Sequence, residues 1–273
     1  MGNNAPIGVF DSGVGGLTVA REIMRQMPEE RIVYFGDTAR VPYGSKSRET
    51  IINFSRQIVK FLYTQEVKAI VIACNTASAF ALETLREEID IPILGVVIPG
   101  AHAAMDATKN GRIGVIGTEG TINSKIYPKY IYALDQDIEV FAKACPLFVP
   151  LVEENWLYDS VTVEIAERYM SELKGYNIDT LVLGCTHYPL LRHTLQKVMG
   201  ENVTLVNPAY ETAISLKSVL RNKDMLAVYE DRENDGLAHK FYVSDGAEKF
   251  KAFANTILPC DVMQTSDVNI EQY

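Results

Sequence analysis

Short apolar runs rich in β-branched residues alternate along this chain with longer amphipathic stretches. Gly, Asn or Asp bound the runs, and this alternation is typical of strand–helix units around a largely parallel sheet. Residues 69–73 are apolar throughout, as a strand requires when helices cover both faces of its sheet. The pattern predicts strands at 7–10, 32–35, 69–73, 93–97, 113–116, 138–141, 180–184 and 203–206, with helices between them such as 48–65, 77–88, 160–173 and 190–198.

The pattern also repeats between the two halves of the chain. Any α/β chain repeats strand, turn and helix to some degree, but here four pairs follow in the same order at nearly constant separation, which indicates two homologous halves. If the halves face each other, the loops at the carboxyl ends of their strands meet at one cleft, where open α/β sheets bind ligands. The matched segments are IGVFDS at 7–12 with IGVIGT at 113–118, VP at 41–42 with VP at 149–150, AIVIAC at 69–74 with TLVLGC at 180–185, and IL at 93–94 with LV at 205–206.

Length, composition and charge narrow the class of protein. A chain of 273 residues favours two modest domains, and 47% hydrophobic with 22% charged residues excludes disordered, collagen-like and disulfide-scaffold classes. The net charge of −9, without a basic stripe, disfavours nucleic acid as a partner. Residues 1–6 lack a signal-peptide pattern, and the most apolar stretch, 69–82, is interrupted by polar residues. We therefore expect a cytoplasmic protein without a membrane partner.

Four cysteines, Cys74, Cys145, Cys185 and Cys260, are far apart and form no CxxC pair, so we expect reduced thiols and no zinc site. A free cysteine is by default a small buried hydrophobe, which fits Cys145 and Cys260. Cys74 and Cys185 instead follow matching strands, and polar residues follow each of them. We expect both to begin a helix, whose N-terminus would lower the thiol pKa.

Two thiols on opposite sides of one cleft suit a reaction that removes a proton from one face of a carbon and returns one to the other. Racemisation and epimerisation are such reactions. One cysteine must be thiolate while the other is thiol, and an ordinary thiol pKa of ~8.5 allows both states.

Other polar groups lie near the same strand ends. Asp11 and Ser12 open the turn 13–16 (GVGG), whose N–H groups could face an anion or simply form a tight turn. Thr18 replaces the third glycine of a dinucleotide fingerprint, and no Walker lysine follows. His187 could exchange a proton with Cys185 or a substrate amine, although a lone histidine is usually structural. Glu153 lies at the matching place in the second half, where a solvated surface carboxylate is the ordinary alternative.

Four motifs together resemble the bacterial glutamate racemases of the cofactor-independent aspartate/glutamate racemase superfamily. The resemblance covers residues 7 to about 220 and implies interconversion of L- and D-glutamate for peptidoglycan, without pyridoxal phosphate or metal. It also implies that Cys74 and Cys185 are the acid/base residues, that Asp11 assists Cys74 and that His187 assists Cys185. The motifs are DSGVGGL at 11–17, GDTARVPYG at 36–44, ACNTA at 73–77 and GCTHYPL at 184–190.

The substrate-binding set expected from the resemblance offers backbone N–H, Ser, Thr and Asn donors rather than an arginine clamp. Such neutral donors can bind carboxylates at helix starts, and cleft depth would then choose between glutamate and aspartate. The expected set is Asp11, Ser12, Pro42, Tyr43, Gly44, Asn75, Thr76, Thr118, Thr121, Glu153, Thr186 and His187.

The resemblance further implies an α/β fold of two pseudo-symmetric, doubly wound parallel-sheet domains facing each other across a central cleft, usually in a homodimer. The first domain would comprise 1–97 plus 208–273, and the second 98–207. Val41 stands where many relatives carry cysteine, 207–210 (NPAY) replaces a turn of small residues, and the chain from 222 onward shows little identity. Alternatives are an aspartate racemase or a related two-thiol racemase, a pyridoxal-dependent racemase with a Schiff-base lysine, and a non-catalytic solute-binding module, which the missing secretion signal disfavours.

Overall fold

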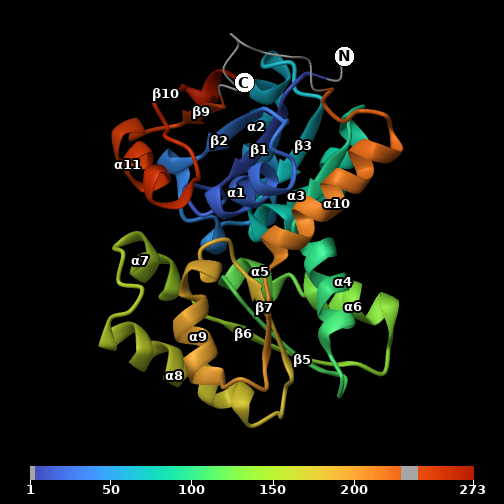
Figure 1. Cartoon of the computed structure of the whole chain (residues 1–273), viewed down its shortest axis with the longest axis vertical. Helices are drawn as coiled ribbons and strands as arrows, with labels where there is room; N and C mark the ends of the chain where they lie inside the picture. Colours follow the sequence, from blue (N-terminus) through green and yellow to red (C-terminus); the bar gives the residue numbers. More distant parts are fainter. Residues whose placement is uncertain (1–3, 229–238) are drawn as a thin grey trace.

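The computed structural model describes residues 4–228 and 239–273. Two α/β lobes are stacked along the long axis of the molecule (Figure 1). Residues 1–3 and 229–238 belong to the predicted first domain, and 1–3 also to the segment searched for a signal peptide; both lie outside the described residues. Among the described helices, none is long and apolar enough to cross a membrane.

The first lobe is built on a six-stranded sheet in the order β10-β9-β2-β1-β3-β4, with every neighbouring pair parallel. In the β1–β2 pair, Ile7 lies opposite Ile32. The N-terminal part of the chain supplies four strands of this sheet, and the C-terminal part supplies the other two. The strands are β1 (Ile7–Asp11), β2 (Ile32–Gly36), β3 (Ala69–Ile72), β4 (Ile93–Gly95), β9 (Lys240–Val243) and β10 (Thr265–Asp267).

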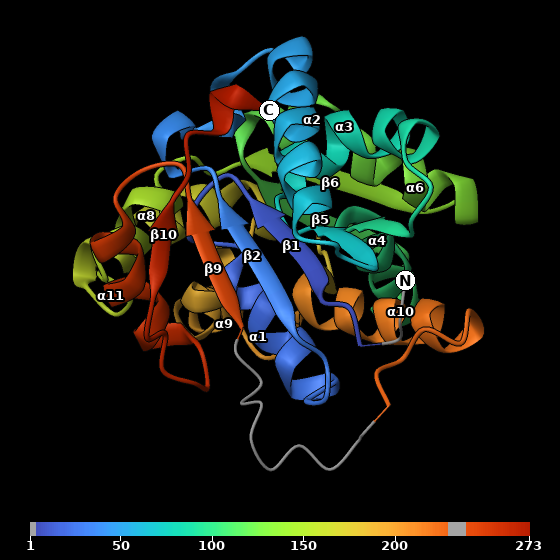
Figure 2. The same cartoon turned by 90° about the horizontal axis from the view of Figure 1, so that it is seen from above.

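Helices cover both faces of this sheet, as its uninterrupted apolar strands require. Side chains alternate along each strand: Ile7 and Val9 pack into a core with α1 (Leu17–Gln26), α10 (Pro208–Asn222) and α11 (Ala247–Ile257). Phe10 points to the opposite face, into a core with α2 (Arg48–Thr64) and α3 (Asn75–Glu88). Figure 2 shows α1 and α2 on opposite sides of β1 and β2.

The second lobe is built on a four-stranded parallel sheet in the order β6-β5-β7-β8. Its strands are β5 (Arg112–Gly117), β6 (Glu139–Ala144), β7 (Thr180–Gly184) and β8 (Thr204–Val206). One face packs against α4 (Val97–Ala107) and α6 (Ile126–Leu134), and the other against α7 (Phe148–Glu153), α8 (Ser160–Lys174) and α9 (Arg192–Met199). The short α5 (Glu119–Asn123) follows β5. The described residues also form four 3-10 helices, η1 (Thr38–Arg40), η2 (Tyr43–Ser45), η3 (Tyr188–Leu191) and η4 (Ile270–Gln272).

The strand order confirms the predicted fold class of two pseudo-symmetric, doubly wound parallel-sheet domains. The order β2-β1-β3-β4 in one lobe corresponds to β6-β5-β7-β8 in the other, so each lobe repeats the same winding. β9 and β10 extend only the first sheet. The recurring Val-Pro pairs, in contrast, differ in local structure: 41–42 lies between two 3-10 helices, and 149–150 lies inside α7.

Several element predictions need correction. The strand expected at 93–97 ends at Gly95, because Val96 already has helical φ and ψ and Val97 begins α4. The helix expected at 190–198 is divided into η3 and α9. The strand expected at 138–141 runs from Glu139 to Ala144. β9 and β10 were not predicted, because the two strands have only four and three residues and β10 is polar. The helices for which no range was predicted are α1, α4, α5, α6, α7, α10 and α11.

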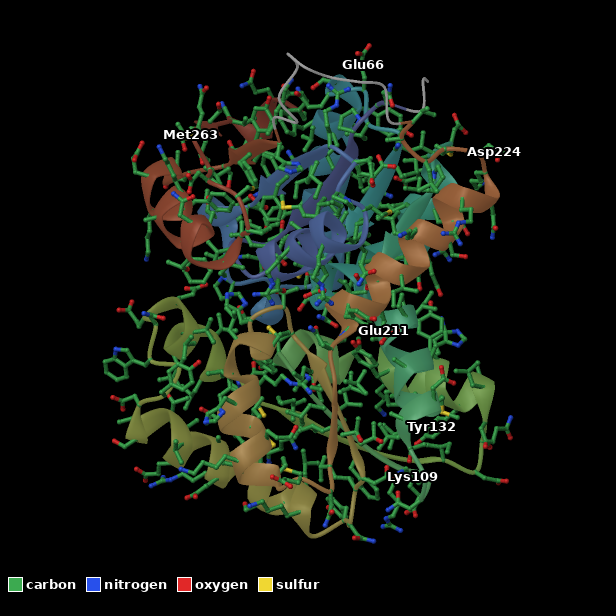
Figure 3. All side chains as sticks on the ribbon, in the orientation of Figure 1. Glu66, Lys109, Tyr132, Glu211, Asp224 and Met263 are labelled. Atoms are coloured by element: carbon green, nitrogen blue, oxygen red, sulfur yellow. The ribbon has the colours of Figure 1, made fainter. Side chains whose placement is uncertain are left out.

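The chain crosses between the lobes after β4 and again after β8. α4 packs against α6 and β7 in the second lobe, and α10 packs against both α1 and α4. Glu211, near the start of α10, lies at the junction of the lobes in Figure 3. We keep the division into 1–97 plus 208–273 and 98–207 as a proposal.

Candidate active site

A cavity of about 260 Å³ lies between the lobes, and Cys74 and Cys185 both line it. Cys74 follows β3 of the first lobe, and Cys185 follows β7 of the second. A larger cavity of about 660 Å³, along α10, contains neither cysteine, so chemistry rather than size identifies the candidate site. The smaller cavity is lined by Ser12, Gly13, Val41, Pro42, Tyr43, Gly44, Cys74, Asn75, Thr76, Thr118, Val149, Pro150, Glu153, Cys185, Thr186 and His187.

Cys74 is the N-cap of α3, as predicted, and its sulfur accepts the Ala77 N–H at 3.5 Å. Its thiol donates to Ser12 Oγ at 3.8 Å. The predicted fall in its pKa is wrong for this state: burial and then the charge of Asp11 raise the pKa of Cys74 to about 12, outweighing the Ala77 and Ser12 contacts. Cys74 therefore holds its proton at neutral pH.

Asp11 ends β1 and is completely buried. Its carboxylate accepts the Gly13 N–H at 3.0 Å and the Thr186 hydroxyl at 3.5 Å. Burial raises the pKa of Asp11, while the positive charge of His187 and backbone N–H groups oppose that rise. Because the Gly13 N–H donates to Asp11, this N–H is not available to an anion, which leaves the tight turn as its role.

Cys185 does not begin an α-helix, and this part of the prediction is wrong. The Tyr188 N–H donates to the Cys185 carbonyl at 3.1 Å and the Leu190 N–H to the His187 carbonyl at 3.1 Å, which close tight 3-10 turns. The first α-helical residue, Arg192, comes seven positions later than Cys185. Cys185 therefore leads into a 3-10 helix and not, like Cys74, directly into an α-helix.

His187 takes that place beside Cys185. Its Nδ1 lies 3.8 Å from Cys185 Sγ, and its Nε2 lies 3.1 Å from Glu153 Oε1. Burial alone lowers the pKa of His187, but the hydrogen bonds to Cys185 and Glu153 outweigh it and raise the pKa to about 10. The His187 hydrogen bond in turn lowers the pKa of Glu153. Glu153, 37% exposed, is thus the partner of an imidazolium rather than an isolated surface carboxylate.

The two sulfurs also influence each other. A negative charge on Cys185 also raises the pKa of Cys74, although less than burial and the charge of Asp11 do. Two interacting groups of like charge resist ionising together. The cavity therefore disfavours two thiolates at the same time, and proton transfer across a carbon requires one thiol and one thiolate.

Residues 37–46 form a loop that is held by a buried carboxylate. Asp37 accepts from Arg40 Nε at 2.8 Å, from Ser244 Oγ at 2.9 Å and from the Tyr43 hydroxyl. The peptide bond before Pro42 is cis. Because the Tyr43 hydroxyl is used inside the protein, we expect the main chain of this loop, rather than that hydroxyl, to meet a ligand.

Three threonine hydroxyls join the lobes on the other side of the cavity. Thr76 Oγ1 lies 2.9 Å from Thr118 Oγ1 and 3.2 Å from Thr121 Oγ1. Thr76 and Thr118 line the cavity, whereas Thr121 is buried behind them. Of the residues predicted for the site, Asp11 and Thr121 alone do not line this cavity.

A model of the Asp/Glu/hydantoin racemase family matches residues 7–213. The chain belongs to this family. It is 47% identical over 265 residues to the glutamate racemase of Geobacter metallireducens, covering 97% of each chain. The structure is similar to that of a glutamate racemase isoform from Bacillus anthracis, with a TM-score of 0.91, 42% identity and coverage of 97% and 98%. It is also similar to Francisella tularensis glutamate racemase in complex with D-glutamate, with a TM-score of 0.90, 39% identity and coverage of 99% and 100%.

Three residues of this racemase-family site were not predicted from the sequence. Gly15 packs directly under Thr186 and His187 of the other lobe. Ser244 reaches Asp37 from the turn after β9, in the segment where little identity was found. Tyr127, on α6, donates to Asn75 at 2.8 Å. Ser244 and Tyr127 act through contacts between segments distant in the chain, so no local motif signals them. Gly15 lies in the glycine-rich turn 13–16, but its contact with the other lobe is not visible in that motif.

Within 4–228 and 239–273, no group of three His, Cys, Asp or Glu side chains could hold a metal ion.

Proposed function

We propose that this chain is a glutamate racemase, which removes the Cα proton on one face of glutamate and returns a proton on the other. The observation that carries the proposal is that Cys74 and Cys185 line one cavity from opposite lobes. The similarity to glutamate racemases over nearly the whole chain supports glutamate as the substrate.

The residues around the two thiols support a role for each in both directions. When Cys185 is the base, its thiolate takes the Cα proton and Cys74 delivers the proton it already holds, while protonated His187 places a positive charge beside Cys185. In reverse, Cys74 must first lose its proton, which Asp11, whose pKa is raised by burial, can receive. Cys185 must gain the proton that it delivers to carbon, and protonated His187 can supply it. Each cycle moves one proton off carbon and one onto it, so no oxidant and no cofactor is needed.

The lining of the cavity supports a small dicarboxylate as the ligand. Ser12, Asn75, Thr76, Thr118 and Thr186 provide neutral hydrogen-bonding groups, and no lysine or arginine is among the lining residues. Such groups bind carboxylates at short range. They do not depend on long-range attraction, and the net charge of −9 gives the protein none for an anionic ligand. A volume of about 260 Å³ suits a single amino acid.

We also propose that the D-glutamate product serves peptidoglycan synthesis, and hence cell shape. We further propose that the enzyme works in the cytoplasm.

We propose in addition that the enzyme is a homodimer. Sedimentation equilibrium of the purified protein tests the dimer. A single species with the monomer mass of 30.4 kDa at every concentration would exclude it.

Isotope exchange tests the reaction. L-glutamate is incubated in deuterated water, and both enantiomers are analysed at early times, with aspartate run in parallel. Two separate bases predict deuterium at Cα of the D-glutamate product and protium in the remaining L-glutamate. Equal early labelling of both enantiomers would point to a single base, and faster turnover of aspartate would exclude glutamate as the preferred substrate.

Cysteine variants test the assignment of the two bases. Cys74→Ala and Cys185→Ala are each expected to abolish racemisation, because each removes the acid or base on one face. Cys260→Ala is the matched control, since Cys260 is a half-buried thiol outside the cavity, and it should keep wild-type activity. Full racemase activity in either cavity variant would overturn the two-thiol mechanism.

A further inference from the structure

A tyrosine from the second lobe contacts a polar residue of the cavity that belongs to the first lobe. Tyr127, on α6, is completely buried, and its hydroxyl donates to Asn75 Oδ1 at 2.8 Å. Asn75 is the first residue of α3, directly after Cys74, and it lines the cavity. The hydrogen bond therefore joins the lobes next to a proposed catalytic thiol.

The donors and acceptors of this pair determine which way the amide points. A buried phenol needs an acceptor for its proton, and burial followed by the nearby Cys185 raises the pKa of Tyr127 far above its ordinary value, so the proton stays. An asparagine amide has one acceptor oxygen and an NH₂ group with two donors. With Oδ1 occupied by Tyr127, the group of Asn75 left for the cavity is the NH₂ donor.

No other hydrogen bond holds the Asn75 side chain within the described part of the chain. The amide can thus turn about its last torsion if the phenol is removed. It would then present its carbonyl oxygen, which repels a carboxylate, about as readily as its NH₂ group.

The ring of Tyr127 is itself held in place by two glycines. A Cβ on Gly184, the residue before Cys185, would lie 3.1 Å from Tyr127 Cε2. A Cβ on Gly100, in α4, would lie 3.2 Å from the Tyr127 hydroxyl. Both distances are shorter than ordinary van der Waals contact, so the phenol occupies space that only glycines at these positions leave free.

We propose that Tyr127 is a positioning residue that orients the Asn75 amide so that its NH₂ group donates to a carboxylate of the substrate. The inference rests on the proposed function, because glutamate supplies the carboxylate. Tyr127 does not touch the reacting atoms, so its contribution is to substrate binding rather than to proton transfer.

Tyr127→Phe removes only the hydroxyl and is the first test. We expect KM for glutamate to rise about tenfold, as for a lost or misdirected hydrogen bond to a charged group, with kcat changed less than about threefold. Tyr130→Phe is the matched control, because the Tyr130 hydroxyl also joins α6 to α3, through Glu83 at 3.2 Å, but on the exposed surface. This control should leave KM unchanged.

A double-mutant cycle separates orientation of the amide from general packing. In an Asn75→Ala background, Tyr127→Phe should no longer change KM, because no amide remains to be oriented. A tenfold rise of KM in that background, or a KM within twofold of wild type for folded Tyr127→Phe alone, would overturn the proposal.

Asn75→Asp decides the matter if Tyr127→Phe does not fold. This variant keeps the acceptor for Tyr127 but replaces the NH₂ donor with a negatively charged oxygen, so KM should rise more than in Asn75→Ala. An equal or smaller rise contradicts a donor role for the Asn75 NH₂ group. Failure of the proposed function itself is distinguishable, because wild-type protein would then not racemise glutamate at all.

Discussion

Gly15→Ala tests whether the glycine-rich turn exists to let the two lobes meet at the thiols. An added Cβ would overlap Thr186 Oγ1 and lie 2.5 Å from His187 Nδ1. Gly15 is not among the glycines with positive φ, so alanine is compatible with its backbone. The effect of the substitution therefore comes from the contact with the other lobe alone.

The neighbouring side chains cannot easily move away. The Thr186 hydroxyl donates to Asp11, and His187 contacts both Cys185 and Glu153. Normal contact requires a shift of about 1 Å, which separation of the lobes would supply. A misplacement of that size costs roughly 100-fold in rate, or about 2.7 kcal/mol of transition-state stabilisation. Overpacking without such separation costs about 1–3 kcal/mol of folding stability.

Initial rates of racemisation, followed by circular dichroism in both directions, measure the effect. We expect kcat/KM to fall about 100-fold in both directions, because both thiols need closed lobes, while thermal unfolding shows a folded protein. Gly175→Ala is the matched control: its added Cβ meets only the Glu172 carbonyl oxygen, at 3.2 Å, and activity should be unchanged. A folded Gly15→Ala enzyme with activity within threefold of wild type would refute the reasoning.

Three further predictions concern buried contacts around the site and the core. Lys68→Ala leaves Glu30, whose Oε2 lies 2.6 Å from Lys68 Nζ in the wild type, buried without its ion-pair partner. We expect the free energy of unfolding, measured in urea, to fall by about 3–5 kcal/mol. The double change Lys68→Met with Glu30→Leu should lower it less, and a larger fall for the double change would contradict this reasoning. Glu153→Gln weakens the pair that raises the pKa of His187, so wild type should be more stable by about 1 kcal/mol between about pH 5 and 6.5, where Glu153 is ionised, and lose that advantage as the pH rises through about 10. A difference that stays constant from 6.5 to 10 in thermal unfolding would exclude this origin. Ser244→Ala removes the hydrogen bond from Ser244 to Asp37 and so loosens the loop 37–46. In steady-state kinetics we expect KM to rise about fivefold with little change in kcat. A fall in kcat as the main effect would argue against this role.

The sequence by itself determined most of the strands of the scaffold and the pair of cysteines that line one cavity. Apolar runs and their periodicity are local signals, so strands such as β1, β3 and β7 were predicted within a residue or two. The repeat placed Cys74 and Cys185 at equivalent strand ends. Because all strands of each sheet are parallel, their carboxyl ends lie along one edge of that sheet. Residues after 222 were the exception, because β9 and β10 are too short to show a pattern.

Only the tertiary structure decided the electrostatics and the partners of those thiols. Exclusion of water and the charge of Asp11 raise the pKa of Cys74 despite its place at a helix start. Cys185 has the His187 imidazole beside it instead of the start of an α-helix. Glu153 contacts the other ring nitrogen of His187. Tyr127 reaches Asn75 from the other lobe. A pKa and the direction of an amide depend on which distant groups exclude water and donate hydrogen bonds, and only folding brings those groups together.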